Sequence, residues 1–146
     1  SKEVRVVPTR SIAEAFAALI DYDPEGEVDA NVEAMSSAIE AVAAGEVTQA
    51  VRDSTSAAGP IAEGDWLGIA RDGIVAVSKD LVGAIEGLLE SLVTDDHELV
   101  TVIEGDGATD AITRHLTVWL EENRPDVAVE VHHGGQPLYP YLLGAE

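Results

Sequence analysis

Hydrophobic residues in the first part of the chain follow two different spacings. Val4 to Val7 is a short β-branched run bounded by Pro8, and it predicts a strand. Ser11 then makes a good helix N-cap, with Glu14 three residues later as its capping-box partner. The apolar residues that follow recur at helical spacing, and they are Ile12, Phe16, Leu19 and Ile20.

A turn over residues 23–26 separates this helix from a second one. Asp29 is the expected cap of the second helix, and Gly45 is expected to end it. The apolar residues on one face of this helix are Val32, Met35, Ile39 and Val42.

The middle of the chain predicts strands joined by short connections. Val47 to Arg52 has a strand pattern, whereas residues 53–64 are rich in Ser, Ala, Gly and Pro and predict a loop. Trp66 to Ala70 and Ile74 to Val77 are two further strands. They are joined by residues 71–73, whose Asp-Gly pair is typical of a β-hairpin.

Helices and strands alternate again in the last part of the chain. Asp80 begins a third helix, Glu98 to Ile103 is an apolar strand, and residues 105–107 turn the chain into a fourth helix. Val127 to Val131 and Leu138 to Leu143 are the last two expected strands. The inward residues are Leu81, Ile85, Leu88, Leu89 and Leu92 in the third helix, and Ile112, Leu116, Trp119 and Leu120 in the fourth.

This order of elements predicts the fold class. Strands alternate with helices at both ends of the chain, and a run of strands joined by tight turns lies between them. Strands joined by tight turns must be antiparallel, whereas strands joined through a helix tend to be parallel. We therefore expect an α/β layered domain with a mixed sheet.

Length and charge narrow the classes of partner. The 146 residues are 46% hydrophobic, enough for a single domain with its own core over residues 1–146. The formal net charge is −20, from 28 acidic against 8 basic residues, so we expect neither nucleic acid nor an anionic membrane surface as a partner. The chain has no cysteine, which fits a reducing cytoplasm, and no apolar run approaches the ~18 residues of a membrane span. It begins with Ser rather than Met and leads directly into the first expected strand, so we expect a piece of a longer protein.

The closing segment, residues 134–141, reads Gly-Gly-Gln-Pro-Leu-Tyr-Pro-Tyr and resembles the end of the C-terminal domain of dihydroxyacetone-kinase-like proteins. These are the large, ATP-using subunits of bacterial two-component fatty acid kinases. Other matching stretches follow in the order of that family, although the match departs at residues 13–14, where Pro-Gln is expected. The matching stretches are residues 7–12, 31–35, 45–48, 50–54 and 64–69.

The resemblance implies a fold and a role. It implies an α/β fold like the first domain of the DegV-type fatty-acid-binding proteins. It also implies a non-catalytic C-terminal domain, with ATP and magnesium bound by a separate N-terminal domain of the parent kinase. Such a domain would dock a DegV-type fatty-acid-binding protein that carries the acyl group, or hold a homodimer together.

Polar residues follow several expected strands, where α/β sheets usually bind ligands. Thr9, Arg10 and Ser11 follow the first strand, residues 105–109 follow the strand 98–103, and His133, Gly134 and Gly135 follow the strand 127–131. Helix N-termini in these places favour anions. The alternative is that Ser11 only caps, Arg10 pairs with a surface acid, and the glycines only turn the chain.

A second group of candidates would contact a partner or ligand elsewhere. Arg52 lies at a strand end beside Asp53, although neighbouring Arg and Asp residues more often form a weak exposed ion pair. Gln136, Tyr139 and Tyr141 belong to the closing segment, and tyrosine suits partner surfaces because its ring is apolar and its tip is polar.

The pattern shows no convincing catalytic or metal site. His132 and His133 are neighbours on a strand and should point to opposite faces, so they cannot easily share one metal ion. The glycines at 105 and 107 lack the rest of a dinucleotide fingerprint and the lysine of a P-loop. We expect no cofactor, no metal and no catalytic residues in this part of the parent protein. The rival hypothesis is an independent small-molecule-binding domain, or a phosphatase-like hydrolase, built around Arg10 and His133.

Overall fold

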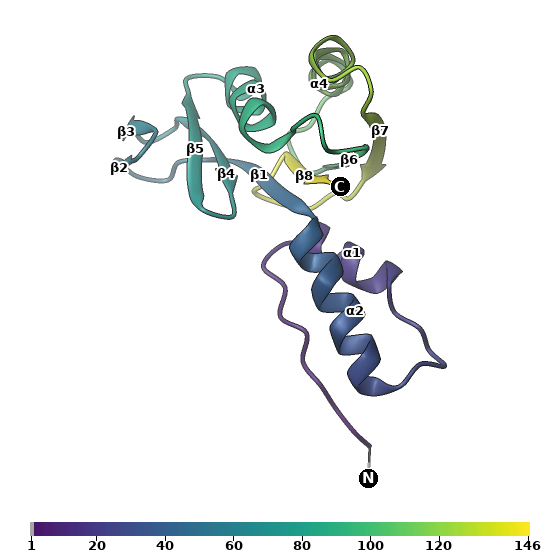
Figure 1. Ribbon diagram of the computed structural model, residues 1–146. Helices are drawn as coiled ribbons and strands as arrows, with labels where there is room; N and C mark the ends of the chain where they lie inside the picture. The colour runs from purple at the N-terminus through teal and green to yellow at the C-terminus, as the bar shows by residue number, and fades with distance from the viewer. Residues whose placement is uncertain (1) are drawn as a thin grey trace. The chain divides into compact units, whose positions relative to one another are not determined.

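The computed structural model describes residues 2–146 and divides the chain into two compact units. Unit 1 ends at Val42, and unit 2 comprises Ala43–Glu146 (Figure 1). The expectation of one domain over the whole chain stays a prediction, because two compact units can still fold as one cooperative domain.

Unit 1 contains two helices, α1 (Ile12–Ile20) and α2 (Val28–Ala41). The predicted cap of α1 is confirmed, because Ser11 Oγ accepts a hydrogen bond from the Glu14 N–H at 3.1 Å. Glu14 reaches back and accepts from the Arg10 N–H at 2.6 Å. The predicted cap of α2 is wrong, because the helix begins at Val28 and its N-cap is Glu27, which makes no side-chain capping bond.

The strand expected at Val4 to Val7 is absent. These residues form no regular element, and Val4 and Val6 keep 75% and 82% of their surface exposed. A β-branched run becomes a strand only when a neighbouring strand satisfies its backbone, so the propensity alone was insufficient here. Helix α1 is also unusual, since its buried residues are small or polar while its large apolar residues are exposed. The buried residues are Ala13, Glu14, Ala17 and Ala18, and the exposed ones are Ile12, Phe16, Leu19 and Ile20.

Unit 2 is built on a six-stranded sheet with the order β5-β4-β1-β8-β6-β7. Its strands are β1 (Ala43–Gln49), β4 (Trp66–Ala70), β5 (Gly73–Ser78), β6 (Leu99–Glu104), β7 (Ala128–His133) and β8 (Tyr141–Ala145). Only β6 and β7 are parallel, and the other neighbouring pairs are antiparallel. The prediction of an α/β fold with a mixed sheet is therefore confirmed, including the β4–β5 hairpin.

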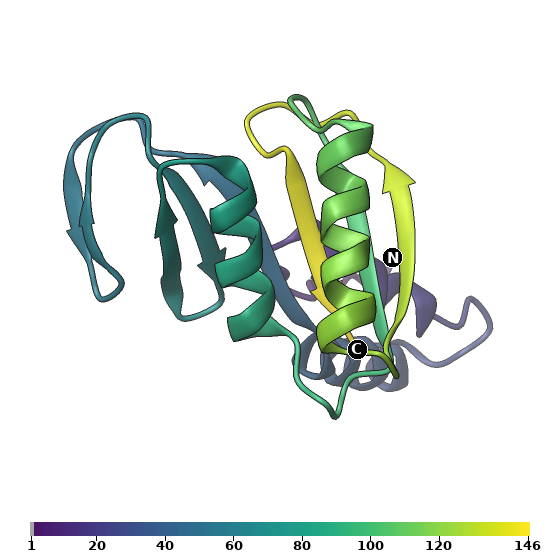
Figure 2. The same cartoon turned by 90° about the horizontal axis from the view of Figure 1, so that it is seen from above.

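Two helices, α3 (Leu81–Leu92) and α4 (Asp110–Asn123), cover one face of this sheet (Figure 2). Helix α3 begins after Asp80, as predicted, and α4 begins at Asp110, shortly after the turn predicted at residues 105–107. Asp80 accepts a hydrogen bond from the Gly83 N–H at 2.8 Å, and Thr109 accepts one from the Ile112 N–H at 3.3 Å. The main core lies between these helices and the sheet. Its fully buried large residues are Tyr141, Ile85, Leu88, Leu89, Leu116, Leu120, Leu143, Val47, Val93, Val100 and Val102.

The segment predicted as a loop at residues 53–64 contains a second, small sheet. Strands β2 (Ser54–Ser56) and β3 (Gly59–Ile61) pair antiparallel as a two-stranded ribbon. The side chains in this ribbon are mostly small and polar, so they lack the hydrophobic alternation by which a strand is recognised in a sequence. The ribbon ends beside a second apolar cluster, formed by Ala50, Ile61 and Leu67.

The closing strand β8 lies in the middle of the sheet between β1 and β6. It begins at Tyr141 rather than at the expected Leu138, because residues 134–140 form an irregular segment before it. Since Tyr141 belongs to β8, the name closing segment is used from here on for residues 134–140 alone. Within the part of the chain that the structure describes, no helix is both long and apolar enough to cross a membrane.

Candidate functional site

A cleft of about 710 Å³ opens in unit 2 where β1 and β8 separate. These strands pair only as far as Val47 and Tyr141, whereas β1 stays paired with β4 as far as Gln49 and Trp66. The closing segment and the turn at residues 105–107 form one wall of the cleft. The end of β1, the start of β4 and the β2–β3 ribbon form the other.

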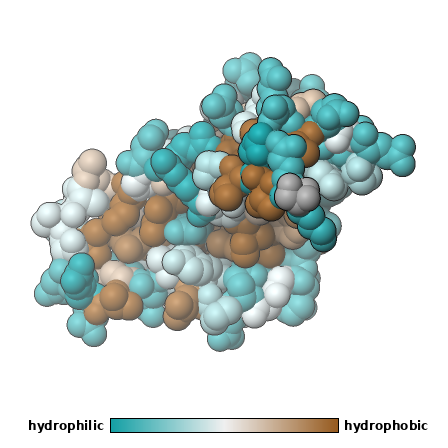
Figure 3. Space-filling model, turned by 90° about the horizontal axis from the view of Figure 1, so that it is seen from below, coloured by the Kyte–Doolittle hydropathy of each residue, from teal (hydrophilic) through white to brown (hydrophobic). Residues whose placement is uncertain are grey.

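The lining of this cleft is mainly apolar with a few polar groups. The apolar residues are Ala50, Val51, Ile61, Trp66, Leu67, Ile74, Leu138, Tyr139 and Pro140. The polar residues are Thr48, Gln49, Arg52, Ser54 and Asp106. Apolar walls with a small number of convergent polar groups are typical of binding sites. Figure 3, which looks at the side of unit 2 opposite to α3 and α4, shows hydrophobic surface over the region of β4 and β5.

Backbone hydrogen bonds fix the closing segment in place. The N–H groups of Gly134 and Gly135 both donate to the Glu104 carbonyl, at 2.8 and 2.9 Å. The amide of Gln136 donates to the carbonyls of Ile103 and Tyr139, at 3.2 and 3.0 Å. These bonds bring the residues that follow β7 against the end of β6, and Gln136 acts there as an internal brace.

Leu138 has an unusual backbone conformation at the mouth of the cleft. Its φ is 70°, in the left-handed region that residues other than glycine rarely adopt. Its carbonyl accepts a hydrogen bond from Thr48 Oγ1 at 2.8 Å, and the surrounding segment is held by the bonds of Gln136. Leu138 is 76% exposed. No local sequence signal predicts this conformation for a leucine.

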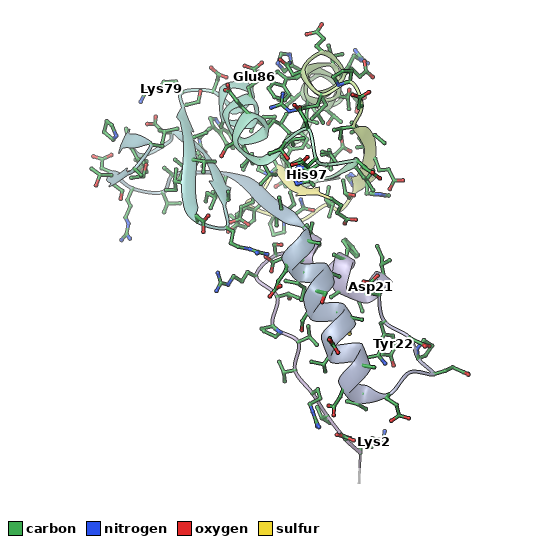
Figure 4. All side chains as sticks on the ribbon, viewed as in Figure 1. Lys2, Asp21, Tyr22, Lys79, Glu86 and His97 are labelled. Atoms are coloured by element: carbon green, nitrogen blue, oxygen red, sulfur yellow. The ribbon has the colours of Figure 1, made fainter. Side chains whose placement is uncertain are left out.

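A buried carboxylate supports the other wall. Asp65 is 5% exposed, and its Oδ1 accepts a hydrogen bond at 2.6 Å from the ammonium of Lys79 at the end of β5 (Figure 4). Its Oδ2 accepts from the Ala62 N–H at 3.0 Å, and its carbonyl accepts from the Ala50 N–H at 2.7 Å. The hydrogen bond from Lys79 is the main reason why the pKa of Asp65 lies below its usual value. Sequence reasoning missed Asp65, because nothing in its neighbourhood marks a buried acid.

A series of hydrogen-bonded polar side chains lies behind the closing segment, on the helix side of the sheet. The Thr113 hydroxyl donates to Glu104, and it lies 2.9 Å from the Tyr141 hydroxyl. Burial raises the pKa of Tyr141 above its usual value. His133 is exposed, and its Nδ1 is 4.0 Å from the Glu104 carboxylate. This arrangement ties β8 to α4, and it places Tyr141 wholly inside the core.

The structure brings together only some of the predicted site residues. Arg52 and Tyr139 line the same cleft, although they lie far apart in the sequence. Tyr141 is fully buried, so the prediction that its side chain contacts a partner is wrong. The reason is that Tyr141 is the first residue of a central strand and faces α4.

The other candidates lie outside the cleft lining. Thr9, Arg10 and Ser11 belong to unit 1, and the strand that was expected to lead into them does not exist. Ser11 caps α1, as the alternative interpretation had it. His133 lies at the end of the edge strand β7. Among residues 2–146, no group of three or more His, Cys, Asp or Glu side chains is placed to hold a metal ion.

Comparison with known proteins gives a consistent result. The FakA-like family of fatty acid kinase C-terminal domains matches residues 1–146. An uncharacterized protein of Staphylococcus epidermidis is 40% identical over 144 residues, which are 99% of this chain and 26% of that protein. Uncharacterized proteins of Staphylococcus haemolyticus and Staphylococcus aureus are 41% and 38% identical, over 97% and 99% of this chain and 26% of each protein. The chain thus spans about a quarter of the length of these relatives. It belongs to the family of C-terminal domains of FakA-like fatty acid kinase proteins.

Proposed function

We propose that this chain is a non-catalytic docking domain of a fatty acid kinase subunit. Its role is to bind the fatty-acid-binding protein that presents the acyl group, and we propose that this partner is of the DegV type. ATP and magnesium are then used by another part of the parent protein. Membership of the family supports the role in a fatty acid kinase. We also propose that the fold of unit 2 is related to the fold of the partner's first domain.

The observation that carries the docking role is the exposed apolar mouth of the cleft. Val51 and Leu138 are 85% and 76% exposed, and they flank a cleft whose walls are apolar. Exposed apolar side chains around a cleft are typical of surfaces that a protein partner covers. The half-buried Tyr139 lines the same cleft.

Charge favours this role over self-association. Two copies of a chain with a net charge of −20 repel each other, whereas a basic surface on a different protein would be attracted. We therefore rank docking above a homodimer. The rival small-molecule interpretation rests on the cleft volume, which falls within the range of ligand pockets.

The docking role is tested by binding of the full-length subunit to its fatty-acid-binding partner. Deleting residues 1–146 should abolish binding. Tyr139→Ala should weaken it, while Tyr22→Ala, which alters a half-exposed tyrosine in unit 1, should not. Raising the salt concentration from about 50 mM to 500 mM should also weaken binding, because screening reduces long-range attraction. Undiminished binding by the deleted subunit would exclude the docking role.

We also propose that the isolated chain turns over neither ATP nor a phosphomonoester. His133, the histidine of the hydrolase alternative, has its Nδ1 4.0 Å from the Glu104 carboxylate. At this distance the Glu104 carboxylate does not hydrogen-bond the His133 ring, so it does not orient the ring as the third group of a catalytic triad would. Steady hydrolysis of a phosphomonoester that is lost in His133→Ala would instead favour the hydrolase alternative.

A further inference from the structure

The large apolar residues of helix α1 face away from the fold of unit 1. Ile12, Phe16, Leu19 and Ile20 share one side of the helix, which we call the α1 face, and Phe16 and Ile20 are 52% and 76% exposed. The opposite side carries alanines and Glu14, which are buried, and α1 packs against α2. An amphipathic helix normally buries its apolar side, because packing supplies most of its stability. The orientation of α1 therefore indicates a packing surface for a partner outside unit 1.

Other parts of unit 1 add to this apolar surface. Most of the large apolar residues that are exposed among residues 2–146 lie in unit 1, although this unit holds less than a third of the chain. They include Val4, Val6 and Tyr22 besides the four residues of the α1 face. Apolar surface that gathers in one region of a protein is typical of an interaction site, whereas single exposed apolar residues are ordinary.

A hollow of about 560 Å³ connects the end of the α1 face with the extended segment that precedes α1. Leu19 and Tyr22 line it from the end of α1, Val7 from the extended segment, and Val32 and Met35 from α2. The extended segment runs beside α2 (Figure 1). Because the lining is mainly apolar, the hollow suits an apolar side chain that is inserted from outside.

The extended segment also has an unpaired backbone. Residues 4–7 have the pattern of a strand, yet they pair with no strand among residues 2–146. Such a run forms a strand when another segment supplies a neighbouring strand. A segment that lies against unit 1 can therefore cover the apolar residues and complete the missing strand pair at the same time.

The part of the parent protein that precedes this domain is the best suited occupant. The family consists of C-terminal domains, and the chain spans 26% of each relative, so most of such a protein lies on the N-terminal side. The extended segment joins that part to unit 1, and a short tether gives an effective concentration on the order of mM. A second copy is disfavoured, because Asp21, Asp23 and Glu25 follow the α1 face and each copy has a net charge of −20.

We propose that the α1 face and residues 4–7 form an intrachain interface, which anchors this domain to the segment of the parent polypeptide that precedes it. That segment packs apolar side chains on the α1 face, inserts one of them into the hollow, and pairs its backbone with residues 4–7. Basic residues at its edge complement the acidic residues after α1. The interface fixes the position of the domain within the subunit. It rests on membership of the family and not on the docking function.

Hydrogen–deuterium exchange tests the interface in the full-length subunit. The amides of α1 and of residues 4–7 should exchange at least tenfold more slowly in the full-length subunit than in a chain of residues 1–146. The double substitution Phe16→Gln and Leu19→Gln should remove most of this protection, because glutamine keeps the helix propensity but not the apolar surface. Equal exchange in the two wild-type proteins, or full protection in the double variant, would overturn the proposal.

A control and a stability measurement separate the interface from the fold of this chain. Val118→Gln makes a similar change at an exposed apolar residue of α4, and it should leave the exchange of α1 unchanged. The double substitution should leave the melting temperature of residues 1–146 unchanged, because Phe16 and Leu19 are already exposed. A clear loss of stability in this chain would place the α1 face within its own fold and contradict the interface.

Photo-crosslinking identifies the occupant. A photoreactive residue at position 16 of the full-length subunit should crosslink to residues that precede this domain. In a mixture of isotopically light and heavy subunits, these crosslinks should join peptides of the same isotopic label. Crosslinks between light and heavy peptides would assign the α1 face to a second copy, and crosslinks to residues 43–146 would assign it to unit 2. Either result would overturn the proposal.

Discussion

At the scale of single residues, Asp65 is the clearest case of a charge that serves the fold. Its carboxylate accepts from Lys79 and from the backbone of Ala62, and its carbonyl holds Ala50, so it joins three parts of the cleft wall. The pKa of Asp65 is lowered mainly by the hydrogen bond from Lys79. A carboxyl with a lowered folded-state pKa stabilises the protein above its unfolded pKa of about 3.9, and this contribution is lost as pH falls through the folded pKa.

We predict that Asp65→Asn reduces the dependence of unfolding free energy on pH in the acid range. The wild type should lose stability between about pH 5 and pH 2, and part of that loss should disappear in the variant. Urea unfolding at a series of pH values measures the slope. Asp96→Asn removes an equal charge at an exposed position and serves as the control. Identical slopes for Asp65→Asn and the wild type would contradict the assignment.

The two glycines of the closing segment are required for different reasons. Gly135 has a φ of 67°, as expected for a turn glycine. Gly134, in contrast, does not have a positive φ. Its constraint is space, because a Cβ there would approach Ile103 Cγ2 to 2.6 Å and would collide with the Gln136 side chain.

We predict that Gly134→Ala and Gly135→Ala each destabilise unit 2 by about 1 kcal/mol or more. Thermal unfolding of both variants measures this, with Gly59→Ala as a positive-φ comparison that has open space around it. Gly134→Ala should be the more sensitive to Gln136→Ala, because removing the Gln136 side chain clears one of the two obstacles. An unchanged melting temperature in both glycine variants would show that the closing segment adapts freely.

At the scale of elements, helix α3 packs tightly against the sheet. Leu88 on this helix is fully buried, and it lies close to Gly45 of β1 and Gly68 of β4. A Cβ at Gly68 would lie 2.9 Å from Leu88 Cβ. The small residues of the sheet therefore allow the helix to approach, and its leucines fill the remaining space. On the outer side of α3, Glu86 points away from the sheet and pairs with His115 at 2.7 Å (Figure 4).

We predict that Leu88→Ala lowers the free energy of unfolding by about 2–5 kcal/mol, as is usual for a leucine truncated in a packed core. Chemical denaturation of the variant measures the change. Leu138→Ala is the comparison, because it shortens a leucine that is 76% exposed, and its effect on stability should be much smaller. Equal losses in the two variants would contradict the packing described for α3.

At the scale of the whole chain, the two units differ in how much they bury. Every residue of the main core lies between Val47 and Ala145, within unit 2. Helix α2 in unit 1 has no buried residue, and α1 buries mostly alanines. Short helices are marginal in water unless an apolar face is packed, so stability should be concentrated in unit 2.

We predict that a chain consisting of residues 43–146 folds by itself with a single cooperative transition, whereas residues 2–42 alone show little helical content. Circular dichroism with thermal melting tests both pieces. Sedimentation of the longer piece checks that its transition is not caused by aggregation. Loss of cooperative unfolding on removal of unit 1 would show that the whole chain is one folding unit.

Local sequence patterns were sufficient to predict those elements whose start or turn is marked by nearby residues. Helices α1, α3 and α4 begin at residues whose side chains cap them, and the Asp-Gly pair marks the β4–β5 turn. The resemblance of the closing segment correctly identified the family. Signals of this kind depend on residues a few positions apart, so they can be read along a sequence.

The remaining features depend on neighbours that are distant in sequence. Tertiary structure alone decided that Val4 to Val7 has no strand partner, that Tyr141 enters the core, and that Leu138 is held at a positive φ. It also placed Arg52 beside Tyr139 by ending the β1–β8 pairing at Val47. The sequence by itself determined helices α1, α3 and α4, the hairpin, the acidic character and the family. The position and lining of the cleft were decided only by the tertiary structure. Strand pairing and burial arise from contacts between segments that are distant in sequence, and a local pattern does not contain such contacts.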